Sequence, residues 1–165
     1  MERRNFVKSV AGTTAGLIIL PSGILSGKSP SDKLNIALIG AHGRGSQHYQ
    51  ALASENVVAI CDVHAGNMAL AAKQYPNAKQ YTDWRKCLEQ KDIDAVFICT
   101  PDHHHAFISI WAMNRGKHVY CEKPMVHKLE EGAEVIATQK KTGKVFEVGS
   151  QRVSSIVTEK TRELF

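Results

Sequence analysis

The stretch LNIALIGAHGRGS (residues 34–46) decides the fold, because an apolar run leads directly into a glycine-rich turn. The run up to Gly40 reads as a buried strand, and the residues after Gly45 as the start of a helix, with Ser46 as its N-cap. A glycine-rich turn between a strand and a helix lets backbone N–H groups approach a pyrophosphate closely. The turn departs from the G-x-G-x-x-G pattern, since His42 stands at the middle glycine position.

Short apolar runs and helical stretches alternate through the rest of the chain. Strands are expected at residues 34–40, 56–62, 79–81, 94–100, 117–124 and 144–149. Helices are expected at residues 46–54, 64–75, 83–90, 103–115 and 128–142. Strands that are apolar throughout are typical of a parallel sheet with helices on both faces. The sequence therefore predicts an α/β fold, a doubly wound Rossmann sheet of about six strands in the order 3-2-1-4-5-6.

The composition excludes several classes of protein. The chain has 165 residues and a net charge of +5, which suits one ordinary domain. The first 27 residues carry +2, and the remaining 138 residues carry only +3, with basic and acidic residues interleaved. Without a basic stripe, we expect no nucleic-acid partner.

Neither the cysteines nor the histidines are spaced like a metal site. The cysteines at positions 61, 87, 99 and 121 fit no zinc pattern and are expected to be core residues, although a disulfide stays open in an exported protein. His42, His48 and His64 read as surface imidazoles near a phosphate. The adjacent histidines 103–105 point about 100° apart on a helix and cannot bind one ion together. No metal is expected.

The N-terminus resembles a twin-arginine export signal. Arg3 and Arg4 precede Lys8 and a long uncharged stretch. We expect residues 1–27 to be this signal and residues 28–33 a polar linker, which predicts a periplasmic or otherwise exported protein. A clean cleavage site is missing, so an uncleaved membrane tether stays open.

Asp62 is the second cofactor signal. It ends the second predicted strand, 22 residues beyond Gly40. A carboxylate there can accept hydrogen bonds from ribose hydroxyls and would repel a 2′-phosphate, which favours NAD over NADP. The alternative is an ordinary strand-end or helix-capping aspartate.

Two further polar segments follow predicted strands. Residues 100–105 (TPDHHH) follow the fourth strand and residues 121–124 (CEKP) end the fifth. In an open α/β sheet, ligands bind outside the carboxyl ends of the strands. Pro124 restricts Lys123 to an extended conformation at that edge, where a lysine can handle protons. Spacing alone leaves open whether Lys123 is catalytic or a surface residue paired with Glu122.

The segments IGAHGRG, CD, ICTPDHHH and CEKP, in this order, resemble the Gfo/Idh/MocA family of oxidoreductases, over about residues 34–152. The resemblance implies that Lys123 is the catalytic-site lysine, which hydrogen-bonds the reacting hydroxyl. It implies a dinucleotide held by Gly40, Gly43, Gly45 and Asp62, with Thr100, Pro101 and His105 on the nicotinamide side. His42, Arg44 and Glu122 complete the expected cofactor-binding set.

The function that the resemblance implies is an NAD-dependent oxidoreductase acting on a sugar or polyol hydroxyl. An NAD-dependent glycosidase and a non-catalytic nucleotide-binding module are the alternatives. Members of this family carry a second, substrate-binding domain, and residues 151–165 read as its helical start. We therefore expect residues 34–150 to be the NAD-binding domain, the second domain to be missing, this chain alone to be inactive, and the full-length protein to be a homo-oligomer.

Overall fold

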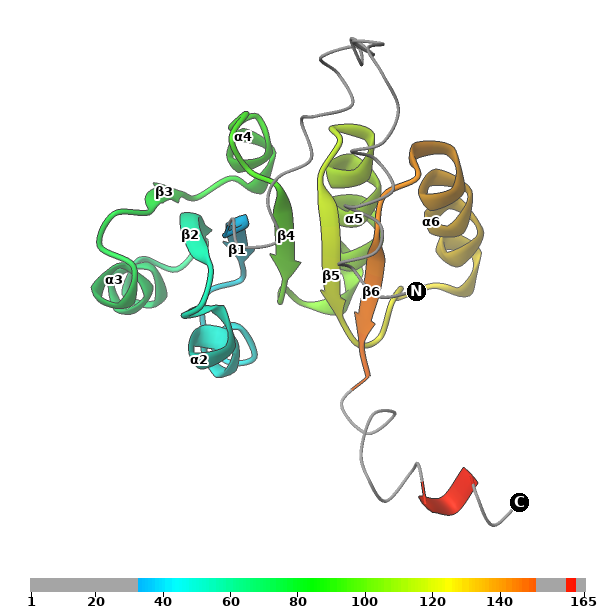
Figure 1. Cartoon of the computed structure of the whole chain (residues 1–165), viewed down its shortest axis with the longest axis horizontal. Coiled ribbons are helices and arrows are strands. Elements are labelled where there is room, and N and C mark those ends of the chain that lie inside the picture. The colour runs from blue at the N-terminus through cyan, green and yellow to red at the C-terminus, as the bar shows by residue number, and fades with distance from the viewer. Residues whose placement is uncertain (1–32, 151–159, 163–165) are drawn as a thin grey trace, which may run out of the picture. The chain divides into compact units, whose positions relative to one another are not determined.

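The computed structural model describes residues 33–150 and 160–162, in which the predicted parallel sheet is present (Figure 1). Its strands are β1 (Asn35–Ile39), β2 (Asn56–Cys61), β3 (Lys79–Tyr81), β4 (Ala95–Ile98), β5 (His118–Glu122) and β6 (Phe146–Gly149). They are ordered β3-β2-β1-β4-β5-β6, and every neighbouring pair is parallel. The predicted fold class and strand order are confirmed. The predicted export signal, nearly all of the linker and most of the predicted tail helix lie outside the described residues.

Helices connect the strands. The α-helices are α2 (Tyr49–Leu52), α3 (Ala65–Gln74), α4 (Trp84–Leu88), α5 (His105–Asn114) and α6 (Leu129–Thr142). Two short 3₁₀ turns, η2 (Gly45–His48) and η3 (Asp102–His104), lead into α2 and α5. Asp83 caps α4 through the backbone N–H of Arg85, and Gly143 ends α6 with a φ of +64°.

Two hydrophobic clusters cover the two faces of the sheet. On one face, α4, α5 and α6 pack against residues such as Ala37, Ile39 and Val96. On the other, α2 and α3 pack against Ile36 and Leu38. Alternate residues of one strand therefore enter different clusters, which explains why the central strands are apolar throughout.

The first predicted helix differs from the expectation. It begins as a 3₁₀ turn, and only residues 49–52 are α-helical. Ser46 is not the N-cap: it lies inside the first turn, and its hydroxyl donates to the carbonyl of Gly43 at 2.9 Å. The turn must stay tight here, because Gly45 packs directly against Gly40.

All four cysteines are buried free thiols, as expected of core residues, although only Cys61, Cys99 and Cys121 end apolar runs. They belong to the two clusters that flank the sheet. Among the residues described, no helix is long and apolar enough to cross a bilayer. In the same residues, no group of histidine, cysteine and acidic side chains could hold a metal ion.

Candidate functional site

A cleft of about 570 Å³ lies at the carboxyl ends of β1, β2 and β4. Six residues predicted to bind the cofactor line it: Gly40, His42, Gly43, Asp62, Thr100 and Pro101. Asn67, Thr82 and Trp84 line it as well and were not predicted. The sheet edge that the sequence indicated is therefore hollowed, and it gathers the turn, the acidic residue and the Thr-Pro segment.

The glycines of the turn have different roles. A Cβ on Gly40 would lie 2.6 Å from the carbonyl carbon and oxygen of Cys99, and one on Gly45 would lie 1.9 Å from the carbonyl oxygen of Gly40. Gly43 has open space around it but a φ of +57°, which side chains rarely adopt. Gly40 and Gly45 allow close packing of the backbone, and Gly43 allows the positive φ that the turn requires. Gly40 and Gly43 line the cleft without side chains, beside the side chain of His42, so a pyrophosphate could approach the backbone at these two glycines.

Asp62 fastens the turn to the start of α3. Its Oδ2 accepts a hydrogen bond from the N–H of Ala41 at 3.0 Å, and its Oδ1 accepts one from the N–H of His64 at 2.9 Å. The N-cap of α3 is His64, whose Nδ1 accepts from the N–H of Asn67. Asp62 is therefore not the cap of this helix, and its carboxylate lies on the wall of the cleft, where a ribose could reach it.

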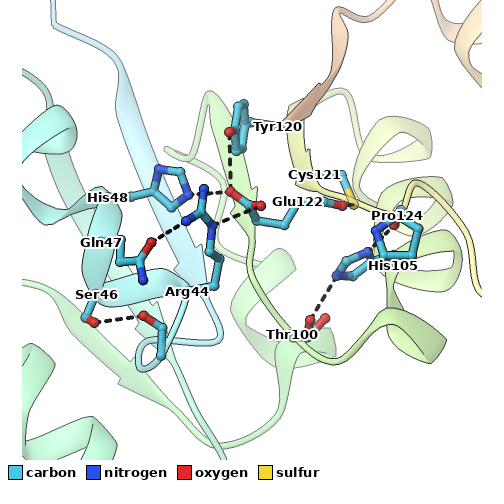
Figure 2. A network of polar contacts seen from close by, with 11 residues as sticks. Arg44, Ser46, Gln47, His48, Thr100, His105, Tyr120, Cys121, Glu122 and Pro124 are labelled. Atoms are coloured by element: carbon cyan, nitrogen blue, oxygen red, sulfur yellow. Dashed lines mark hydrogen bonds and ion pairs between the residues drawn. The ribbon is translucent and has the colours of Figure 1, made fainter. Parts of the chain in front are cut away.

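The Thr-Pro segment contributes one wall of the cleft, but His105 does not. His105 is 2% exposed, and its Nδ1 and Nε2 lie 2.6 Å and 2.9 Å from the carbonyl oxygens of Pro124 and Thr100 (Figure 2). It thus ties the segments after β4 and β5 together. The hydroxyl of Thr100 is buried without a hydrogen-bond partner among the described residues, which suits a polar ligand group on this wall.

The other two histidines after β4 do lie at the cleft. His103 and His104 line it, with ring centroids 4.4 Å apart. Burial lowers the pKa of His104. A hydrogen bond to His127 lowers the pKa of Asp102. Asp102 lies near both His103 and His127, at 3.9 Å and 3.2 Å, so the start of this helix has ordinary polar contacts.

Lys123 is exposed immediately after β5, at the same edge of the sheet. Glu122 is buried, and its carboxylate contacts Arg44, His48 and Tyr120. This does not favour the alternative of a surface pair between Lys123 and Glu122, and the catalytic role of Lys123 stays a prediction. The Lys123–Pro124 peptide bond is cis, which the prediction of an extended Lys123 did not include.

Arg44 and Glu122 face one another and are absent from the residues that line the cleft. Arg44 Nε lies 3.1 Å from Glu122 Oε2, and His48 Nε2 lies 2.7 Å from Glu122 Oε1. Burial pushes the pKa of Glu122 upward, but His48 and Arg44 outweigh it, and the pKa lies below its ordinary value. Their direct contact with a cofactor stays a prediction.

The sequence did not predict that His48 and Gly149 lie beside Glu122. His48 was expected at the surface, yet its side chain is only 13% exposed and is bonded to Glu122. A Cβ on Gly149 would lie 2.4 Å from the hydroxyl of Tyr120 and 3.1 Å from Glu122 Oε1. Both contacts join distant parts of the chain, so no local pattern signals them.

Similarity to known proteins agrees with this site. An inositol 2-dehydrogenase of Salmonella typhimurium is 33% identical over 125 residues, which cover 72% of this chain and 37% of that protein. An α-N-acetylgalactosaminidase of Bacteroides fragilis is 33% identical over 124 residues, 68% of this chain and 29% of that protein. The chain thus spans about a third of the length of these curated relatives.

The fold has solved counterparts as well. The crystal structure of myo-inositol 2-dehydrogenase from Lactobacillus plantarum matches 81% of this chain and 41% of that chain, with a TM-score of 0.74 and 26% identity. Residues 34–150 match the sequence model of the Gfo/Idh/MocA oxidoreductases, which describes their NAD-binding Rossmann fold. These residues cover the sheet, the glycine turn, Asp62 and the strand-five end. The chain therefore belongs to the Gfo/Idh/MocA oxidoreductase family, and residues 34–150 are its NAD-binding domain.

Proposed function

We propose that the natural protein containing this chain is an NAD-dependent oxidoreductase that acts on a hydroxyl of a sugar or polyol. One observation carries the proposal: an exposed lysine, Lys123, directly follows β5 at the same sheet edge as the glycine turn and Asp62. If a dinucleotide binds along that edge, the side chain of Lys123 can transfer a proton to or from the substrate.

The described residues supply the cofactor's contacts. The N–H groups of Gly40, Ala41 and Gly45 already donate within the protein, so the N–H groups between Ala41 and Gly45 would receive the pyrophosphate. Asp62 would receive the adenosine ribose. The buried hydroxyl of Thr100 offers a hydrogen bond on the cleft wall. NAD, when bound, supplies the hydride acceptor for the oxidation of a carbinol carbon.

Lys123 handles the proton of the reaction. Its Nζ would hydrogen-bond the substrate hydroxyl and take its proton as the carbon loses a hydride. Because His105 bonds the carbonyl of Pro124 and Glu122 is fixed in the protein interior, both neighbours of Lys123 are held. A lysine held on both sides loses less conformational entropy when it engages a substrate.

The substrate class rests on the relatives. The Salmonella protein is an inositol 2-dehydrogenase, so a cyclic polyol leads the panel to be tested. The test incubates the natural protein with NAD and a series of polyols and sugars, and follows NADH by absorbance. Stoichiometric NADH with at least one polyol supports the proposal, whereas NAD binding without turnover of any substrate favours a non-catalytic module.

An NAD-dependent glycosidase is the second candidate, because the Bacteroides relative is an α-N-acetylgalactosaminidase. Such an enzyme regenerates NAD in each turnover. Release of sugar from a nitrophenyl glycoside without net NADH would select this candidate over the dehydrogenase.

We also propose export by the twin-arginine route, on the strength of Arg3, Arg4 and the uncharged stretch that follows. Fusing residues 1–33 to a reporter that is active only after export tests this. Export should stop when both arginines become lysines. A reporter that stays in the cytoplasm with the natural sequence contradicts the proposal.

A further inference from the structure

Glu122 is a buried acidic residue at the end of β5 that reaches the segment after β1. His48 Nε2 lies 2.7 Å from its Oε1, Arg44 Nε lies 3.1 Å from its Oε2, and the hydroxyl of Tyr120 donates to Oε1 at 3.4 Å. Figure 2 shows these three side chains converging on the carboxylate. A carboxylate that is 3% exposed needs such partners to stay ionised.

Arg44 carries this contact into the glycine turn. Its guanidinium donates a hydrogen bond to the side chain of Gln47 and forms an ion pair with Glu122, so it is held between two partners. Next to it, the N–H of Gly45 donates to the carbonyl of His42 at 3.0 Å. The second half of the turn is thus fastened to β5 through one side chain.

Aromatic rings and a glycine of the neighbouring strand surround the carboxylate. The ring of Tyr120 stacks on Phe97 with centroids 4.6 Å apart, and His48 packs edge-on to both rings, at 5.3 Å and 5.7 Å. On the neighbouring strand β6, Gly149 pairs with Glu122, and a Cβ there would collide with the hydroxyl of Tyr120. The network is therefore closely packed on the side of Tyr120 and Gly149.

We propose that Glu122 is a positioning residue for the dinucleotide. Through Arg44 it holds the glycine turn in the shape that receives a pyrophosphate. The proposal rests on the proposed function, since NAD is the ligand concerned. Arg44 and Glu122 do not line the cleft, which agrees with an indirect role for Glu122.

The test measures the affinities of the 165-residue chain for two parts of NAD. ADP-ribose carries the pyrophosphate, whereas adenosine lacks it. Glu122→Gln keeps the shape of the side chain and removes its charge. We expect this variant to bind ADP-ribose about tenfold more weakly, a loss of 1.4 kcal/mol, and adenosine less than twofold more weakly. Glu147→Gln, an exposed change on β6, is the matched control and should alter neither.

A purely structural role gives a different result. If Glu122 only stabilised the fold, both affinities would fall together, or neither would change at temperatures well below unfolding. Either result overturns the proposal. If the natural chain binds neither NAD nor ADP-ribose, the proposed function itself fails, and this outcome is distinct from a variant that binds like the natural chain.

Double substitution tests whether Glu122 acts through Arg44. The variant carrying both Arg44→Gln and Glu122→Gln should bind ADP-ribose no more weakly than the weaker single variant, because each change breaks the same contact. Losses that multiply would mean that Glu122 acts independently of Arg44, and would overturn the proposal.

Arg44→Lys keeps the test decisive if Glu122→Gln does not fold. The side chain of Arg44 is 37% exposed, so this variant should fold, but an ammonium cannot bridge Gln47 and Glu122 as a guanidinium does. The same selective loss of ADP-ribose affinity is expected. Unchanged ADP-ribose binding in Arg44→Lys would overturn the proposal.

Discussion

The ends of β1 and β5 lie at one edge of the sheet but obtain their geometry by opposite means. After β1 the shape depends on missing side chains: Gly40 and Gly45 pack where any Cβ would meet backbone atoms. After β5 it depends on side chains that are present, namely Glu122 and His105, which fasten the chain on either side of Lys123. The turn after β1 should therefore be most sensitive to an added atom at its packed glycines, and the segment after β5 to the loss of a charged or hydrogen-bonding side chain.

The largest expected effect is at the β5 end. In the natural protein that contains this chain, Lys123→Ala should lower kcat by about 10²- to 10⁴-fold, because the proton-transfer group is lost. NAD affinity should change little, since the turn and Asp62 are untouched. Lys123→Arg should not restore the rate, because a guanidinium cannot act as a base.

Steady-state kinetics and a dinucleotide titration measure the two quantities. Lys140→Ala, an exposed change on α6, is the control and should leave both unaltered. Near-normal turnover of Lys123→Ala would remove this residue from the mechanism.

At the β1 end, Gly45→Ala should destabilise the fold by about 3 kcal/mol or more, because its Cβ would lie 1.9 Å from the carbonyl oxygen of Gly40. Gly43→Ala is the matched control. Its Cβ has open space, so only the strain of a φ of +57° remains, which costs about 1–2 kcal/mol. Urea unfolding of both variants gives the comparison, and equal costs would show that packing does not limit this turn.

The expected preference for NAD over NADP is a smaller effect than the destabilisation by Gly45→Ala. NAD should bind at least about tenfold more tightly than NADP, or 1.4 kcal/mol, because the carboxylate of Asp62 accepts from ribose hydroxyls and repels a 2′-phosphate. Asp62→Asn should narrow the difference below about threefold in a fluorescence titration. Asp92→Asn, an exposed change before β4, should leave it intact. Equal affinities in the natural chain would contradict the role given to Asp62.

The smallest effect is a pH dependence at the β5 end. The folded-state pKa of Glu122 lies below its ordinary value of 4.5, so its ionised form stabilises the folded state fully above that value. This contribution is lost as the pH falls from 4.5 through the lowered pKa. Urea midpoints between about pH 6 and 3 should fall less steeply in Glu122→Gln than in the natural chain. Parallel curves would show that Glu122 does not titrate in this range.

The sequence was sufficient for the features that local patterns encode. Unbroken apolar runs predicted the strands and their order, and the spacing from Gly40 to Asp62 predicted two walls of the cleft. It was insufficient where distant segments meet. His48 bonds Glu122 across 74 residues of sequence, and His105 turns inward to two carbonyls. Neither contact follows from spacing, because burial of a polar side chain depends on partners that only the folded chain supplies.

The reactivity of the four buried cysteines can be used to measure how often this domain opens. Burial raises the pKa of Cys61, Cys87, Cys99 and Cys121 to about 12. At neutral pH about one thiol in 10⁵ is then a thiolate, and the sulfur atoms are shielded as well. An alkylating reagent therefore modifies only molecules that have opened. The rate of alkylation, measured without denaturant, then gives the free energy of opening. Any dinucleotide that binds the closed domain slows that rate in proportion to its occupancy, so a mass spectrum can serve as a binding assay.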